Sequence, residues 1–171
     1  MSLFNKIRSL FNKTSVGIPI MLFICVIIIL GRSLSLNSHI SSTLINKPAP
    51  IFELPSLINP NQSISNKNFI GQMTLFNVWA TWCYACTLEH DFLMHLSQDK
   101  NITLIGLDYK DDTNHAKALL EQYGNPYSMI AVDTSGNTAI NWGVYGTPET
   151  FLIDRKGIVR YKHIGAKTVL K

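Results

Sequence analysis

Two cysteines separated by two residues, Cys83 and Cys86, are the side chains of this sequence whose type and spacing point most directly to chemistry. They lie in the segment Trp82-Cys83-Tyr84-Ala85-Cys86, where a strand-like run becomes a helix-like one. A cysteine at a helix N-terminus faces free backbone N–H groups and the positive end of the helix dipole, which favour thiolate over thiol. The second cysteine lies one turn deeper and is close enough to close a disulfide. The pair therefore predicts a redox dithiol.

Other interpretations of the pair are weaker. A zinc site needs four ligands, and apart from His90, four residues after Cys86, no second Cys or His pair has suitable spacing. A c-type haem attachment site needs His directly after the second cysteine, and Thr87 stands there instead. A purely structural disulfide is an alternative interpretation, although closing so small a loop removes little entropy from the unfolded chain. The third cysteine, Cys25, lies in an apolar run and is expected to act as a small hydrophobe.

Alternating strand-like and helix-like segments surround the dithiol. The run MTLFNVWA predicts a strand over 73–80, and apolar residues at helical spacing predict a helix from Tyr84 to Leu96. Further along the chain we expect strands at 102–107, 129–132, 150–153 and 158–161, a helix from Ala116 to Tyr123, and a weak helical piece ending at Trp142. This alternation predicts an α/β fold with a mostly parallel sheet covered on both faces.

The most apolar stretch of the chain, Val16–Leu30, precedes this domain. Fifteen helical residues rise roughly 22 Å, short of a hydrocarbon core of about 30 Å, whereas residues 14–36 would rise roughly 34 Å if Arg32 snorkels. We therefore expect residues 1–13 to be a basic cytoplasmic flank and 14–36 a single-pass transmembrane anchor that places the domain outside the cytoplasm. A cleaved signal peptide and a buried core helix are the alternatives.

The charge distribution argues against nucleic acid as a partner. Hydrophobic residues make up 46% of the chain and charged residues 15%, and the formal net charge is +4. Residues 1–47 contain five basic residues and no acid, so the remainder is close to neutral and has no electrostatic footprint for nucleic acid. Polar residues over 37–46 predict a flexible tether, and a folded domain is expected over 47–171.

Four segments resemble the CcmG/DsbE family of thiol:disulfide interchange proteins. They are Phe76-Asn77-Val78-Trp79-Ala80-Thr81-Trp82-Cys83-Tyr84-Ala85-Cys86, Asp108-Tyr109-Lys110-Asp111-Asp112, Gly124-Asn125-Pro126-Tyr127 and Gly143-Val144-Tyr145-Gly146-Thr147-Pro148-Glu149-Thr150-Phe151-Leu152-Ile153-Asp154. The first marks only the thioredoxin superfamily, whereas the second and fourth make the resemblance specific. The resemblance covers about residues 47–165.

This resemblance implies a thioredoxin-like fold with a central β-α insertion. It also implies that the protein is a reductant in cytochrome c maturation, with its domain in the bacterial periplasm and its anchor in the inner membrane. It implies apocytochrome c or the maturation protein CcmH as substrates and a DsbD/CcdA-type membrane carrier as the source of electrons. No metal or organic cofactor is expected beyond the dithiol. Family members usually continue into a further helix after the last hairpin, so we expect that C-terminal helix to be missing.

The resemblance also assigns roles to single residues. Cys83 would be the attacking thiol and Cys86 the resolving thiol. Pro148 would be a cis-proline beside the disulfide, and Thr147 would offer its backbone to an extended substrate peptide. Trp82 and Tyr84, which flank Cys83, are expected to contact substrate, with Trp82 also shielding the disulfide.

Two acids are candidates for tuning the dithiol. Glu89 follows Cys86 by three residues, and Glu149 follows Pro148. A like charge disfavours a forming thiolate, which destabilises the reduced form and makes the protein a better reductant. Thioredoxins carry a buried aspartate six residues before the first cysteine, where this chain has Asn77, so either acid could replace it as a proton relay. The alternative for each is a solvated surface acid.

Two other functions stay open. A general ResA/TlpA-like reductant would serve other exported thiols, such as the copper-site cysteines of an oxidase. A Sco-like copper-binding module would use three residues between its cysteines and a distal histidine, and the two-residue gap here argues against it.

Overall fold

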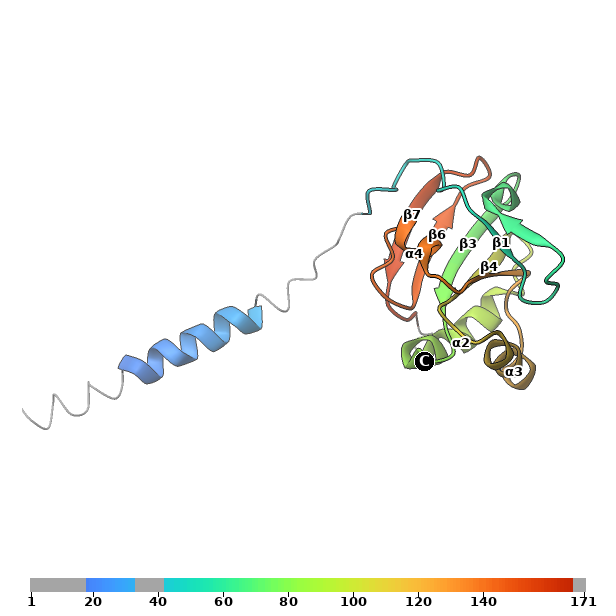
Figure 1. Ribbon diagram of the computed structural model, residues 1–171. Coiled ribbons are helices and arrows are strands. Elements are labelled where there is room, and N and C mark those ends of the chain that lie inside the picture. The colour runs from blue at the N-terminus through green and yellow to red at the C-terminus, as the bar shows by residue number, and fades with distance from the viewer. Residues whose placement is uncertain (1–17, 33–41, 168–171) are drawn as a thin grey trace, which may run out of the picture. The chain divides into compact units, whose positions relative to one another are not determined.

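The computed structural model describes residues 18–32 and 42–167. The chain divides into two units, Met1–Ile40 and Ser41–Lys171, and the second unit holds the dithiol. Its elements, labelled in Figure 1, are in chain order β1 (Glu53–Pro55), β2 (Ser63–Ser65), η1 (Asn66–Phe69), β3 (Met73–Trp79), α2 (Tyr84–Leu96), β4 (Ile102–Tyr109), α3 (Thr113–Tyr123), β5 (Met129–Asp133), α4 (Asn137–Asn141), β6 (Glu149–Ile153) and β7 (Val159–Ile164).

A five-stranded sheet in the order β5-β4-β3-β6-β7 forms the centre of this unit. β3, β4 and β5 are parallel, whereas β6 pairs antiparallel with both β3 and β7. The expectation of a mostly parallel sheet holds for β3, β4 and β5, and the final hairpin places one strand, β6, antiparallel to both of its neighbours. The pair α3 and β5 lies between β4 and α4 in chain order.

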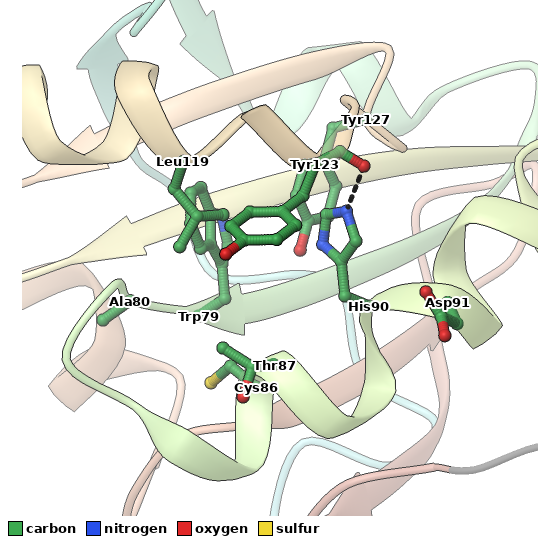
Figure 2. Close-up of a pocket in the computed structure, with 9 residues that line it drawn as sticks. All are labelled: Trp79, Ala80, Cys86, Thr87, His90, Asp91, Leu119, Tyr123 and Tyr127. Atoms are coloured by element: carbon green, nitrogen blue, oxygen red, sulfur yellow. Dashed lines mark hydrogen bonds between the residues drawn. The ribbon is translucent and has the colours of Figure 1, made fainter. Parts of the chain in front are cut away.

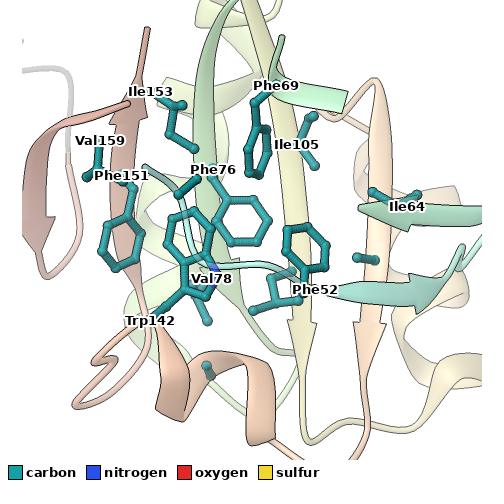
Figure 3. Close-up of a cluster of buried hydrophobic side chains, with 14 residues drawn as sticks. Phe52, Ile64, Phe69, Phe76, Val78, Ile105, Trp142, Phe151, Ile153 and Val159 are labelled. Carbon is teal, nitrogen blue, oxygen red and sulfur yellow. The ribbon is translucent and has the colours of Figure 1, made fainter. Parts of the chain in front are cut away.

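Alternate residues of each strand face opposite sides of the sheet. From β3, Phe76 and Val78 enter an aromatic core shown in Figure 3, in which the Trp142 ring lies 4.6 Å from that of Phe76 and 5.0 Å from that of Phe151. Trp79 faces the other side, where the apolar faces of α2 and α3 cover the sheet. Asn77 therefore points toward α2, in the layer that contains the dithiol.

Residues 42–46 belong to the folded unit, although they were assigned to the flexible tether. Leu44 and Ile45 pack against the aromatic core, and the Asn46 N–H donates to the Val159 carbonyl at 2.8 Å. The Arg160 guanidinium also donates to Asn46 Oδ1 at 2.8 Å. The domain thus begins before Lys47. The short strands β1 and β2 were not expected either.

The prediction of a single-pass anchor in the inner membrane, with a periplasmic domain, is corrected. The apolar stretch is helical over residues 18–32, which rise roughly 22 Å against the 30 Å or so of a hydrocarbon core. Among the described residues, no helix has both the length and the apolar character needed to cross a membrane. Residues 14–17 and 33–36 of the expected span, and the basic flank 1–13, lie outside the described residues.

The last described residue, Lys167, follows β7 closely. Between Gly165 and Lys167 the chain forms no helix. Residues 168–171, on which the expectation of a missing C-terminal helix partly depends, lie outside the described part.

Candidate active site

Cys83 and Cys86 form a disulfide at the start of α2, with their Cα atoms 5.3 Å apart. Cys83 is the N-cap of the helix, in extended backbone conformation, and both side chains are buried, with 5% and 8% exposed. The chain reaches this position from β3 through a short turn in which the Cys83 N–H donates to the Ala80 carbonyl at 3.3 Å. The expected pairing and the expected helix start are both observed.

The helix N-terminus directs a donor at the first sulfur. The Cys86 backbone N–H points to Cys83 Sγ at 3.1 Å, as the capping contact of α2. In the dithiol form, this donor and the positive end of the helix dipole favour a thiolate at Cys83 over one at Cys86. The geometry therefore suits Cys83 to nucleophilic attack on a disulfide.

The loop after β4 holds the turn that carries the dithiol. Asp111 accepts hydrogen bonds from the backbone N–H and the hydroxyl of Thr81, the latter at 2.7 Å. The Trp82 indole N–H donates to the Lys110 carbonyl at 3.2 Å. These contacts give a physical reason for the Tyr-Lys-Asp-Asp segment, which in the sequence analysis only supported a resemblance.

Exposed aromatic side chains flank Cys83 in the chain and precede Pro148. Trp82 is 58% exposed, Tyr84 78% and Tyr145 70%. The Thr147–Pro148 peptide bond is cis, as the resemblance implied. Because Val78 pairs with Glu149, Pro148 lies at the end of β3 from which the chain turns toward Cys83.

Glu89 is 1% exposed, which excludes the interpretation of a solvated surface acid. The Asn77 amide donates to Glu89 Oε1 at 2.9 Å and to Thr150 Oγ1 at 3.0 Å, and accepts from the Tyr127 hydroxyl at 2.7 Å. The Lys167 N–H donates to Glu89 Oε2 at 3.3 Å. Burial nevertheless dominates and raises the pKa of Glu89 above its ordinary value, partly offset by the Asn77 hydrogen bond.

Glu149 is also buried, but on the opposite face of the sheet. Asn77 pairs with Thr150 on the α2 side, so Glu149, the partner of Val78, points into the aromatic side. There its carboxylate lies 2.8 Å from the Lys162 ammonium and accepts the Tyr145 backbone N–H at 2.9 Å. Lys162 also donates to the Gly143 carbonyl at 2.7 Å, so the pair fastens the loop that leads to Pro148.

Asp108 is a buried acid for which the sequence indicates no role. It lies at the end of β4, paired with Trp79 of β3, and it is fully buried with no hydrogen-bond partner at either carboxylate oxygen among the described residues. Burial, followed by the negative charge of Asp111, raises the pKa of Asp108 to about 7. Its single sequence signal is the placement of an acid at the end of an otherwise apolar strand.

A cavity of about 520 Å³ opens beside Cys86, between α2 and α3 (Figure 2). Its lining residues are Trp79, Ala80, Cys86, Thr87, His90, Asp91, Leu119, Tyr123 and Tyr127. One nitrogen of the His90 ring, Nε2, lies 3.2 Å from the Tyr123 carbonyl oxygen. Within residues 18–32 and 42–167, no three Cys, His, Asp or Glu side chains come together in a way that could hold a metal.

A buried cysteine pair at a helix start, a cis-proline at the end of the neighbouring strand and a thioredoxin-like sheet define a thiol:disulfide oxidoreductase of thioredoxin type. The profile of the Redoxin family matches residues 44–169. The chain is 42% identical to the thiol:disulfide interchange protein DsbE of Allochromatium vinosum, over 86% of this chain and 82% of that protein. It is also 42% identical to DsbE of Escherichia coli (strain K12), over 86% and 83% of the two chains.

A solved structure assigned as DsbE, from Chlorobium tepidum, superimposes with a TM-score of 0.59 at 26% identity, over 72% of this chain and 86% of that one. Identity near 40% over most of both chains, together with the Redoxin match, shows that the chain belongs to the DsbE family of thiol:disulfide interchange proteins. It is therefore a thiol:disulfide oxidoreductase.

Proposed function

We propose that this oxidoreductase works as a reductant in cytochrome c maturation, keeping the haem-site cysteines of apocytochrome c, or the cysteines of CcmH, reduced. The observation that carries the proposal is the Cys86 N–H directed at Cys83 Sγ at 3.1 Å, at a helix N-terminus bordered by exposed aromatic rings. It supports a nucleophilic Cys83 thiolate beside a surface that can contact a polypeptide.

The proposed cycle uses only the two thiols. The Cys83 thiolate attacks a substrate disulfide, forming a mixed disulfide and releasing one substrate thiolate. Cys86 then attacks Cys83 Sγ, so the Cys83–Cys86 disulfide forms and the second substrate sulfur leaves as a thiolate. The substrate gains two electrons and the enzyme loses two. A DsbD/CcdA-type carrier would return them.

Substrate recognition is proposed to use the surface around Cys83. Trp82 and Tyr84 are exposed and would contact the substrate chain, and the backbone of Thr147 would pair with it as an added strand. Pro148, cis and buried beside the end of β3, would set the orientation of that backbone. The substrate would then be recognised mainly through contacts of its side chains with these aromatic rings, and less through charge.

Redox tuning is proposed to depend mainly on Glu89. Its carboxyl is buried in the same layer as the dithiol, where a negative charge disfavours a thiolate and so makes the protein more reducing. The tuning role predicted for Glu149 is kept as a weaker proposal. The Lys162 ammonium at 2.8 Å compensates the charge of Glu149, and the two acids lie on opposite faces of the sheet.

Two alternative functions can be separated from this proposal. A general ResA/TlpA-like reductant would act on other exported thiols through the same Cys83 chemistry. A Sco-like module would bind copper tightly, and a titration of the reduced protein with Cu(I) tests this possibility.

The test is to replace Cys86 with Ala in the host and to identify what accumulates as a mixed disulfide on Cys83. Apocytochrome c or CcmH on Cys83 would support the proposal. Recovery of only unrelated exported proteins would reject the assignment to cytochrome c maturation and leave the oxidoreductase class intact. A Cys83→Ala/Cys86→Ala variant is the matched control, since it can trap nothing at this site.

A further inference from the structure

The cavity beside Cys86 places a histidine next to the resolving cysteine. Cys86 and His90 are four residues apart on α2, so they lie on the same face of the helix, with Cβ atoms roughly 5 to 6 Å apart. Both line the cavity of about 520 Å³ between α2 and α3, which is large enough to admit water. A water in this cavity could therefore relay a proton between the two side chains.

The hydrogen bond of His90 determines which ring nitrogen is free. Nε2 lies 3.2 Å from the Tyr123 carbonyl oxygen, and a carbonyl only accepts, so Nε2 must carry the hydrogen. In neutral imidazole Nδ1 is then an acceptor, and it faces the inside of the cavity (Figure 2). Among the described residues, no hydrogen bond to Nδ1 is formed. The ring is therefore held with its basic nitrogen toward the space that Cys86 also borders.

We propose that His90 is the general base that removes the proton of Cys86 when Cys86 resolves the mixed disulfide. His90 Nδ1 takes the proton from the Cys86 thiol as its sulfur attacks Cys83 Sγ. The Cys83–Cys86 bond forms, and the bond from Cys83 to the substrate sulfur breaks. The imidazolium then returns its proton to the departing substrate thiolate or to solvent, so protons and electrons balance.

Other ionisable groups near the ring do not replace it. Tyr127, from the segment after α3, donates its hydroxyl hydrogen to Asn77, and Tyr123 contributes a carbonyl acceptor from α3. Asp91 lines the cavity from α2. Glu89 is held by Asn77, on the side of α2 toward β6, and does not line the cavity.

This inference rests on the proposed order of attack, in which Cys86 is the resolving thiol. Its test uses Ellman's reagent, a chromogenic aromatic disulfide, on the full reduced chain with Cys25→Ser to remove the third thiol. The first release of chromophore reports attack by Cys83, and the second reports resolution by Cys86. A small disulfide needs no protein partner, so this readout survives even if the role in cytochrome c maturation is rejected.

His90→Gln keeps an N–H donor for the Tyr123 carbonyl but has no basic nitrogen. We expect it to slow the second release about tenfold or more at pH 7, with the first release unchanged. The difference should vanish at a pH high enough to ionise Cys86 without a base. Added imidazole should restore the second release in His90→Ala, a variant that leaves space in the cavity. His95→Gln, an exposed change on the same helix, should match the parent.

An unchanged second release in His90→Gln across the pH range would overturn the proposal. So would a variant Glu89→Gln that slowed the second release while His90→Gln did not, because Glu89 would then be the base. The imidazole arm separates loss of the base from a loss of helix structure, since free imidazole cannot repair a misfolded helix.

Discussion

The Asn77 amide donates a hydrogen bond of 2.9 Å to Glu89 Oε1, joining the centre of β3 to the helix that carries both cysteines. Thioredoxins have a buried aspartate at the position of Asn77. In this chain the amide stands at that position, and the buried carboxyl approaches it from α2. In this chain the buried acid beside the dithiol therefore lies on helix α2 and not on strand β3.

Replacing Glu89 with Gln should raise the reduction potential, making the protein a weaker reductant. The substitution removes a negative charge that disfavours the thiolate, so the reduced form becomes more stable. We expect a shift of roughly 10 to 30 mV, since 30 mV corresponds to about a tenfold change in the equilibrium constant. Equilibration of both proteins with a glutathione redox buffer measures it. An equal or lower potential in Glu89→Gln would count against this role.

Breaking the Glu149–Lys162 pair from one side should destabilise the fold strongly. Both side chains are nearly inaccessible, with 0% and 3% exposed, so Lys162→Met leaves a buried carboxylate without its partner. Loss of one partner of a buried ion pair costs about 3 to 5 kcal/mol. The free energy of unfolding from urea titration measures this cost. Lys162→Met combined with Glu149→Leu should recover part of it, and a double variant as unstable as the sum of both singles would argue against direct coupling.

Asp108→Asn should stabilise the protein, and more so at high pH. The pKa of Asp108 is about 7 in the folded chain and near its ordinary value of 3.8 when unfolded, so the unfolded state ionises first. Ionisation of Asp108 therefore lowers the free energy of unfolding progressively between about pH 4 and pH 7, and the full penalty persists above that range. The variant lacks this decline and should gain on the order of a few kcal/mol at pH 8.

Thermal unfolding of Asp108→Asn and its parent at pH 5 and pH 8 measures the effect. Asp99→Asn, an exposed change at a residue without such burial, serves as the control. A gain that was the same at both pH values would show that the benefit does not come from the charge of Asp108.

Trp142→Ala should be among the most destabilising changes in the aromatic core. The Trp142 side chain is completely buried, and its ring contacts Phe76 at 4.6 Å, Phe151 at 5.0 Å and Phe69 at 5.9 Å between centroids. Truncation of such a side chain costs about 3 to 5 kcal/mol. Trp142→Phe should cost less, because it keeps an aromatic ring and removes an indole N–H that has no partner among the described residues. Urea titration of both variants tests this order.

The local elements around the dithiol could be predicted because their signals are local. The run from Met73 to Trp79 has a strand pattern, and the apolar positions from Tyr84 to Leu96 recur at helical spacing, so β3 and α2 were both expected. The strands β1 and β2, with three residues each, are too short to produce a pattern. The antiparallel pairing of β6 with β3 was not expected, because it is a contact between segments distant in sequence.

The functional residues also differ in how far the sequence could predict them. The Cys83–Cys86 pair was visible from spacing, whereas the surroundings of the acids depended on register. Glu89 and Glu149 lie on opposite faces of the sheet. This follows from the pairing of Val78 with Glu149, which the sequence does not show. Lys162 and Tyr127 were missed because each meets its acidic or amide partner only across the folded chain.

The most direct test of the central claim uses Cys86→Ala with Cys25→Ser and an oxidised peptide carrying the haem-attachment motif Cys-x-x-Cys-His. Mass spectrometry of the mixture, with and without prior digestion, gives the stoichiometry and the site of any adduct. The account predicts one peptide per chain, joined through Cys83, and no adduct in the matching variant that also carries Cys83→Ala. Failure of Cys83 to form an adduct with this peptide, under conditions where it reacts with Ellman's reagent, would contradict the account.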